Sequence, residues 1–196
     1  MAVRLEGALA LRKALRKFEP ELAKEQRKEM AKALKPVVKK ARGFVPANDL
    51  ILTNWQQANA SSTAKFPYFD FKAAKAGIGY RTTPAKPNRH GFRALARIEN
   101  KTASGAIFET AGRKNPQGRP WDPKNSSKKY SHSANRNAGK QFIDALNNAQ
   151  TIGGSGLDKG RAIFKAWEQD HGKAQDGVIR AIETAARKFK ARTLVK

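Results

Sequence analysis

The side chains that could carry catalysis or bind a metal are few and scattered in this chain. The three histidines are His90, His132 and His171, and no two of them share a short motif. Asp170 and His171 are adjacent, but neighbouring helical residues point about 100° apart and cannot orient one another. Cysteine is absent, which excludes disulfides, thiolate metal ligands and cysteine nucleophiles. We therefore predict no metal, no cofactor and no catalytic residues.

Two further patterns could carry chemistry. Gly153-Gly154-Ser155-Gly156 is rich in glycine, but it lacks the Lys-Ser/Thr that follows a phosphate-binding loop, so a linker is the better interpretation. Glu99 and Glu109 fall in separate expected strands. There, paired-carboxylate chemistry stays open beside ordinary surface charge. An enzyme is the least favoured class of protein.

Positive charge is the strongest property of the sequence. Its 196 residues contain 40 Lys+Arg against 16 Asp+Glu, a formal net charge of +24. A charge of this size favours polyanionic partners, which are nucleic acid or an acidic protein surface. No apolar run approaches the roughly 18 residues of a membrane span, and no signal-peptide pattern is present at the start. We expect a soluble protein that is made in a cytosol and does not engage a membrane.

The segment from Arg113 to Lys140 is the best candidate for a binding site. It contains eight Lys/Arg and one acidic residue, Asp122, a net charge of +7. Asn, Ser, Gly and Pro fill most of the rest, which indicates a loop that becomes ordered against a partner. The alternatives are a contact with a phosphate backbone, docking to an acidic subunit, or a solubilising surface. The candidate contact residues are Arg113, Lys114, Arg119, Lys124, Lys128, Lys129, Arg136 and Lys140.

The segments on either side of this loop must position it. Their sequence patterns predict an α+β fold in a single domain, residues 1–196. We expect long N-terminal and C-terminal amphipathic helices packed on a small antiparallel β-meander, with long loops. The parts in chain order are a helical arm (1–43), an aromatic-rich loop (44–75), the β-meander (76–112), the basic loop (113–140) and the C-terminal helices (141–196).

Apolar residues recur at helical spacing through the arm, which predicts one bent helix or two consecutive helices. Pro20 suits the first turn of a second segment, whereas Pro36 should kink or interrupt the helix. Gly43 is the expected stop. The loop that follows is dense in aromatic residues, which either pin it to the core or contact a partner; they are Trp55, Phe66, Tyr68, Phe69 and Phe71.

The sequence pattern of residues 76–112 predicts three strands. The first contains Ile78, Tyr80 and Thr82, the second runs from Phe92 to Ile98 after a turn, and the third spans Ala106–Thr110. In the C-terminal part, residues 142–146 predict a short helix, and residues 151–156 a flexible break. A long amphipathic helix follows, with Asp158 as its candidate N-cap and a break near His171-Gly172.

Five short strings follow the order of these elements. They are Val3–Gly7, Leu11–Leu15, Lys35–Pro46 at a Val-Pro step, and Ile98–Lys101 followed by Ala106–Gly112. All five resemble segments of tail-component proteins of long-tailed phages (siphophages), and the last two resemble their "N-x-x-x-a-x-[YF]-x-E-x-G" strand pair. That tail-completion family includes relatives of the lambda-like minor tail protein Z. The chain departs from the family in its basic insertion between Gly112 and Gln141 and in its aromatic-rich loop.

The resemblance implies a structural virion protein of the phage neck or tail top, with no catalytic residues. Such a protein completes the tail and joins it to the head-side connector as part of a homo-oligomeric ring. Its neighbours would be neck, tail terminator or tail tube subunits, and it could contact double-stranded DNA without reading its sequence. It would be assembled in the host cytoplasm. The alternatives are a non-specific nucleic-acid-binding basic protein and an enzyme such as a nuclease with scattered acidic ligands.

Overall fold

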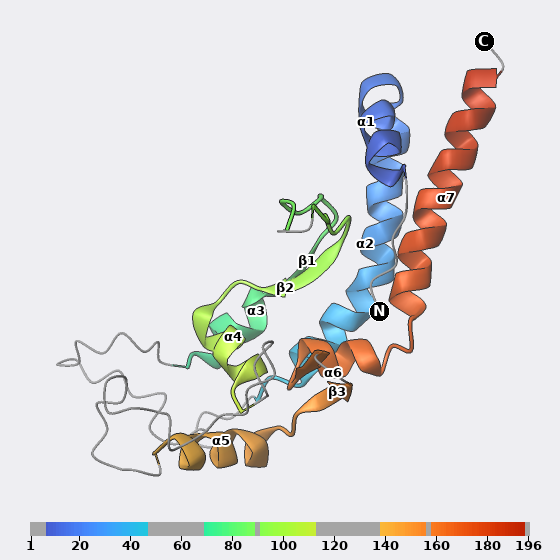
Figure 1. Cartoon of the computed structure of the whole chain (residues 1–196). Coiled ribbons are helices and arrows are strands. Elements are labelled where there is room, and N and C mark those ends of the chain that lie inside the picture. The colour runs from blue at the N-terminus through green and yellow to red at the C-terminus, as the bar shows by residue number, and fades with distance from the viewer. Residues whose placement is uncertain (1–6, 47–68, 89–90, 113–137, 156–157, 195–196) are drawn as a thin grey trace. The chain divides into compact units, whose positions relative to one another are not determined.

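The fold was analysed in a computed structural model of the chain, which describes residues 7–46, 69–88, 91–112, 138–155 and 158–194. These residues form an α+β fold that is mostly helical, with two small antiparallel sheets of two strands each (Figure 1). The predicted fold class is therefore confirmed. The chain divides into two compact units: unit 1 contains residues 1–37, 80–98 and 170–196, and unit 2 contains residues 38–79 and 99–169.

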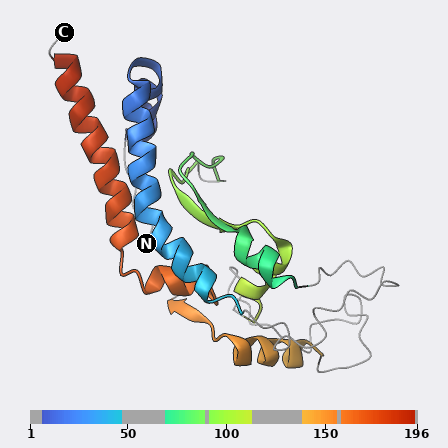
Figure 2. The ribbon, with the colours of Figure 1, turned by 180° about the vertical axis from the view of Figure 1, so that it is seen from behind.

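Unit 1 is built on two long antiparallel helices. These are α2 (Pro20–Gly43), whose residues 38–43 belong to unit 2, and α7 (Lys173–Leu194). Figures 1 and 2 show the two helices side by side. A shorter helix, α1 (Ala8–Phe18), precedes α2 and contacts α7. Part of the core of this unit consists of Leu15, Leu22, Ala23 and Ala185, with Leu11 and Phe189 packed against them.

The sequence predicted the helix boundaries of unit 1 well. The chain leaves helical geometry at Glu19, and Pro20 is the first residue of α2, where its missing N–H costs nothing. The helix ends at Gly43, as expected. The predicted break before α7 is also present, because His171 and Gly172 both have positive φ angles, of 51° and 81°. Pro36 was expected to kink or interrupt the arm; the helix is not interrupted, because α2 continues through Pro36.

The first sheet consists of two strands at the base of a long hairpin. Strand β1 (Ile78–Arg81) pairs with β2 (Arg97–Asn100) in the first sheet. The turn predicted between them is present, but the second strand begins at Arg97 and not at Phe92, which is exposed.

The predicted third strand is wrong. Residues Ala103–Thr110 form helix α4, so the expected meander has two strands here. Thr102 begins the helix, because its Oγ1 accepts a hydrogen bond from Gly105 N at 3.2 Å. The buried residues Ser104, Gly105, Phe108 and Glu109 recur at a spacing of four, which is the period of a helix.

Unit 2 gathers short elements around a small core. Its other elements are α3 (Phe71–Gly77), α5 (Ala138–Ala149), the hairpin β3 (Gly153–Ser155) and β4 (Asp158–Gly160), and α6 (Ile163–Glu168). Helix α6 packs on both strands of the hairpin, and α4 contacts α3 and β4. The buried apolar side chains of this core include Val45, Phe69, Ala74, Ile78, Phe108, Leu146, Ala162 and Ala166.

Two further sequence expectations are corrected in unit 2. The expected flexible break is strand β3, paired in register with β4. Asp158 was predicted to cap a helix, but it is the first residue of β4. The short helix predicted at residues 142–146 is confirmed as α5. Of the aromatic-rich loop, Phe69 is 3% exposed and packs against the ring of Phe108, with 5.6 Å between centroids. Trp55, Phe66 and Tyr68 lie outside the described residues.

Candidate functional site

The candidate contact residues predicted from the sequence fall almost entirely outside the part of the chain that the structure describes. Seven of the eight, from Arg113 to Arg136, are not described. Lys140 lies in the first turns of α5, and its side chain is not described. The basic segment therefore stays a prediction, and the described surfaces must be considered on their own.

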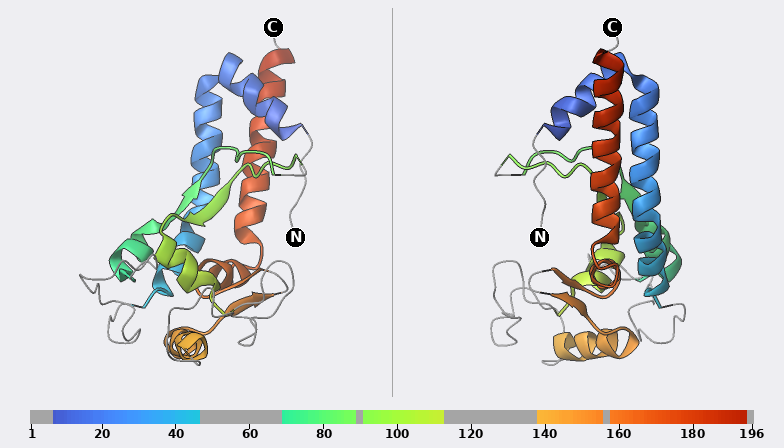
Figure 3. Two further views of the ribbon diagram at one scale, coloured as in Figure 1. Left: turned by 60° about the vertical axis from the view of Figure 1, so that its left-hand side comes forward. Right: turned by 90° about the vertical axis from the view of Figure 1, so that its right-hand side faces the viewer.

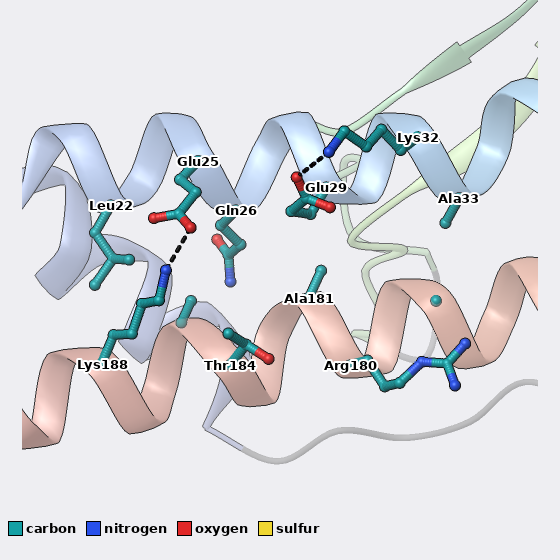
Figure 4. Close-up of a pocket in the computed structure, with 12 residues that line it drawn as sticks. Leu22, Glu25, Gln26, Glu29, Lys32, Ala33, Arg180, Ala181, Thr184 and Lys188 are labelled. Carbon is teal, nitrogen blue, oxygen red and sulfur yellow. Dashed lines mark hydrogen bonds and ion pairs between the residues drawn. The ribbon is translucent and has the colours of Figure 1, made fainter.

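A groove lies between α2 and α7 in unit 1, with a volume of about 540 Å³ (Figure 4). Small or apolar residues and the buried Gln26 line it together with charged residues of both signs. We call it the arm groove. It is lined by Leu22, Glu25, Gln26, Glu29, Lys32, Ala33, Gly177, Arg180, Ala181, Thr184, Ala185 and Lys188.

Ion pairs cross and border the arm groove. Glu25 of α2 and Lys188 of α7 point toward one another and pair across it (Figure 4). This hydrogen bond from Lys188 lowers the pKa of the Glu25 carboxyl. Glu29 and Lys32 pair along α2 at 2.7 Å. These side chains are about half exposed, so each pair contributes little to stability.

Gly177 brings the two helices close together at the groove. A Cβ atom placed on Gly177 would lie 2.6 Å from Cβ of Ala33, which is closer than two carbon atoms can pack. The glycine lowers helix propensity by about 1 kcal/mol relative to alanine, and close packing against α2 is the reason for its place here.

A second surface of unit 1 is the hairpin of residues 80–98, which we call the basic hairpin. Arg12 of α1 is 9% exposed and its Nη1 donates to the carbonyl oxygen of Thr82 at 2.5 Å. Burial and the nearby Arg27 and Arg16 lower the pKa of Arg12. Arg97 Nη1 donates to Thr83 O at 3.2 Å. In both views of Figure 3 the green arms of the hairpin extend past the edge of the α2–α7 pair.

Hydrogen bonds join the two arms of the basic hairpin on either side of residues 89–90, which lie outside the described residues. Backbone N of Asn88 donates to Phe92 O and its Oδ1 accepts from Phe92 N, each at 2.9 Å. Gly91 adopts a φ of 74° and donates to Asn88 O at 2.9 Å. Farther from the tip, Ala85 N donates to Ala94 O at 2.9 Å. The turn holds Phe92 with 42% of its surface exposed.

Unit 2 contains a buried polar cluster made of Glu109, Arg161 and Asn147. Glu109 on α4 is 5% exposed. Its two oxygens accept hydrogen bonds from the backbone N–H groups of Ala162, Ile163 and Phe164 at 2.8, 3.1 and 3.0 Å. Ala162 has no side-chain cap of its own, so the carboxylate of Glu109 caps the start of α6 from a distant part of the sequence.

Arg161 is completely buried beside this cap. Its Nη1 donates to the carbonyl oxygens of Phe108 and Ala111 at 2.9 and 2.7 Å, and its Nη2 donates to Asn147 Oδ1 at 2.6 Å. Its Nε has no partner among the described residues. Burial lowers the pKa of Arg161 to about 10, and the charge of Glu109 partly opposes this shift. The cluster ties α4, α5 and α6 together.

Of the other residues considered for catalysis, Asp170 has a structural role. Asp170 Oδ2 accepts from Ala174 N at 2.5 Å, at the start of α7, and His171 is exposed in the preceding turn. His90 and His132 lie outside the described residues. Within the described ranges, no group of three His, Asp or Glu side chains is placed to hold a metal ion. No helix in those ranges is long and apolar enough to span a membrane.

The strings that resemble the phage family occupy positions that determine the fold of unit 2. Asn100 Nδ2 donates to Ala74 O at 3.1 Å, and its Oδ1 accepts from Thr102 N at 3.0 Å. Glu109 caps α6. Gly112 has a φ of 81°, and a Cβ there would lie 2.6 Å from Ile143 Cγ2. The expected strand pair is a strand followed by a helix.

Comparison of the chain with protein-family models, with curated proteins and with solved structures finds no significant match.

Sequence reasoning missed the basic hairpin and the buried polar cluster. The signal for the hairpin was available, because residues 80–98 contain five Lys/Arg and no Asp or Glu. The signal for the cluster was weaker. Glu109 stands among apolar residues in Ala106-Ile107-Phe108-Glu109, which suggests burial, but its partners lie more than 50 residues away.

Proposed function

We propose that this chain is a structural virion protein of a phage neck or tail top. It completes the tail and joins it to the head-side connector as one subunit of an oligomeric ring. The observation that carries the proposal is the helical arm of unit 1, which exposes large apolar side chains in a strongly basic context. Phe18 at the end of α1 is 64% exposed and Leu9 is 38% exposed. Subunit contacts are a natural use for such side chains.

The sequence resemblance supports the same role. Asn100, Glu109 and Gly112, which belong to two of the strings that resemble the family, hold the elements of unit 2 together. These positions would persist in a family that shares a fold and not a reaction. Neighbouring neck, tail terminator or tail tube subunits would then cover the arm, and the particle would form in the host cytoplasm.

The net charge of +24 supports a place beside double-stranded DNA. A ring that lines a DNA passage needs phosphate contacts without base readout. The proposal assigns no catalytic step, no metal and no cofactor to the chain. Cleavage of DNA that depends on divalent cations would contradict it.

The test is the mass and shape of the full chain in solution. Native mass spectrometry and negative-stain electron microscopy should give a closed ring of identical subunits, and Phe18→Ser should shift the mass toward the monomer. As a control, Lys24→Gln changes an exposed residue of α2 and should leave the mass unchanged. In the phage, removal of the gene should leave heads and tails that do not join. A monomer at all concentrations, together with normal particles after gene removal, would refute the proposal.

A non-specific nucleic-acid-binding protein is the alternative, and the basic hairpin is the observation that favours it. The two functions differ in what the isolated subunit does. Tight DNA binding by a monomer that forms no ring, with a steep dependence on salt, would favour the alternative. Ring formation with weak DNA binding would favour the neck protein.

A further inference from the structure

We infer that the basic hairpin, residues 80–98, is a duplex-DNA-binding arm in which Lys86 and Arg93 contact phosphates and Phe92 inserts at a base step. The inference rests on the proposed function only for the presence of double-stranded DNA. It gives the contact to Lys86, Phe92 and Arg93, which the structure describes, in place of the segment Arg113–Lys140. Ring formation is measured separately, so the inference and the proposed function can fail independently.

Charge is the first argument. Residues 80–98 contain five Lys/Arg and no acidic residue, so the hairpin concentrates positive charge on a narrow ribbon. Lys86 and Arg93 are both exposed. Among the described residues, neither has an ion-pair partner, in contrast to Lys188 and Arg192 on α7, which pair with Glu25 and Glu19. Two cations held without counter-charge favour a polyanion over a protein surface of mixed charge.

Register is the second argument. The hydrogen bond from Ala85 N to Ala94 O pairs the two arms of the hairpin. Lys86 and Arg93 are the next residue on each arm in the direction of the tip. Like charges at facing positions of a hairpin destabilise it. A phosphate group that contacts both would remove that repulsion, so the arrangement is better suited to the bound state than to the free one.

The tip supplies the third argument. Phe92 is 42% exposed, although an aromatic ring of this size is usually buried. The hydrogen bonds between Asn88 and Phe92 fix the backbone that carries it. A two-stranded ribbon fits a DNA groove, and apolar side chains at such tips act as wedges between base pairs. An acidic protein partner would use the charge but would not require the exposed ring of Phe92.

Side-chain hydrogen bonds also hold the base of the hairpin in place. Arg12, which is nearly buried, donates to Thr82 O, and Arg97 donates to Thr83 O. Two of the arginines near the base of the hairpin therefore hold its backbone. An arm whose base is fixed loses less conformational entropy when it binds.

The experiment measures binding of the full chain to a duplex of about 30 base pairs by fluorescence anisotropy, across a salt series. The double variant Lys86→Gln/Arg93→Gln should bind about tenfold more weakly at moderate salt, and the slope of log K against log salt should flatten by about 2. The matched control Lys24→Gln/Lys28→Gln removes the same charge from exposed positions of α2. It should change neither quantity by more than a small fraction of that effect.

Phe92 gives an independent readout. Phe92→Ala should weaken binding about tenfold with no change in the salt slope, because a wedge acts without releasing counterions. Phe92→Leu keeps an apolar wedge and should retain most of the affinity. Circular dichroism of each variant verifies that the chain is still folded.

Three results would overturn the inference. The first is equal loss of binding in the hairpin and α2 double variants, which would make net charge the only cause. The second is full binding by the hairpin variant when replacement of the eight basic residues of Arg113–Lys140 abolishes it. The third is an unchanged affinity of Phe92→Ala for DNA together with a tenfold loss of polyglutamate binding by Lys86→Gln/Arg93→Gln. That result would make the hairpin a contact for acidic protein.

Discussion

In unit 1, acidic side chains lie at the surface and pair with Lys or Arg over the helices, as Glu25 does with Lys188 and Glu19 with Arg192. In unit 2, Glu109 and Arg161 are buried, and most of their hydrogen bonds go to the backbone. The same residue types thus form exposed ion pairs in one unit and bind buried backbone groups in the other. The difference teaches that a high net charge does not identify which charged residues face partners.

The largest effect should come from Glu109, whose loss tests whether unit 2 depends on its buried charge. Glu109→Ala leaves three backbone N–H groups without an acceptor and leaves the Arg161 guanidinium without a nearby negative charge. It should lower the free energy of unfolding by about 3–5 kcal/mol. Urea denaturation measures it. Glu109→Gln keeps one acceptor oxygen and should lose less. The exposed Glu183→Ala on α7 should change stability by less than about 0.5 kcal/mol. Equal effects of the two alanine variants would remove the contrast between the units.

Arg161 should come next, and its effect should depend on pH above neutrality. Arg161→Met strands the carbonyl oxygens of Phe108 and Ala111 and should cost about 3 kcal/mol near neutral pH. Its pKa is lowered to about 10 in the folded chain, so the unfolded chain binds the proton more tightly. The cost of burying the charge is therefore fully present below pH 10 and is relieved as the pH rises above that value toward the ordinary pKa of arginine.

The wild-type chain should consequently gain stability relative to Arg161→Met between pH 9 and pH 11, measured by chemical denaturation at each pH. A difference that stays flat or shrinks would contradict the pKa shift. In addition, the effects of Arg161→Met and Glu109→Gln should add to more than the effect of the double variant, because the two side chains share one cluster.

Gly177 tests close packing in unit 1. Gly177→Ala improves helix propensity by about 1 kcal/mol, but the new Cβ would lie 2.6 Å from Cβ of Ala33. Separation of the helices should outweigh the gain and leave a net loss of about 1–2 kcal/mol. The swap Gly177→Ala/Ala33→Gly restores the space and should recover most of the loss in thermal denaturation. A more stable Gly177→Ala variant would show that the contact relaxes freely.

The smallest effect should be that of the Glu25–Lys188 pair. The pKa of Glu25 is lowered by its hydrogen bond from Lys188. The pair therefore stabilises the fold above the unfolded-state pKa of about 4.5. That contribution is lost as the pH falls through the lowered pKa. Glu25→Gln should abolish this small acid-induced loss, and Lys188→Gln should do the same, whereas a loss that persists in both variants must originate elsewhere. Unfolding between pH 3 and pH 6 provides the measurement.

The sequence predicted unit 1 far better than unit 2, for a physical reason. The arm buries one face of long helices, so apolar spacing reports it directly: Leu22, Met30 and Leu34 of α2 and Ala174 and Ile182 of α7 are all buried. Pro20, Gly43 and Gly172 mark helix ends through local backbone preferences. None of this needs knowledge of distant residues.

Unit 2 depends on contacts that the local sequence does not carry. The residues Ala106–Thr110 read as a strand because Ile107 and Thr110 are β-branched. The helix there is stabilised by burial of Glu109 against α6, more than 50 positions later. Likewise, β3 and β4 are three residues each, with glycine in both, and their pairing is supported by packing of α6. The described candidate surface, the basic hairpin, had a charge signal that the larger charge of Arg113–Lys140 obscured.

Unit 1 is assembled from segments that are far apart along the chain, and this has a consequence during synthesis. Helices α1 and α2 are complete at Gly43, but α7, which covers their apolar face, begins at Lys173. At ribosomal speeds of roughly 5–20 residues per second, the apolar face of α1 and α2 stays uncovered for on the order of ten seconds before α7 is synthesised. In that interval Leu15 and Leu22 are accessible to chaperones and to other nascent copies, whereas the segments of unit 2 are already available to fold.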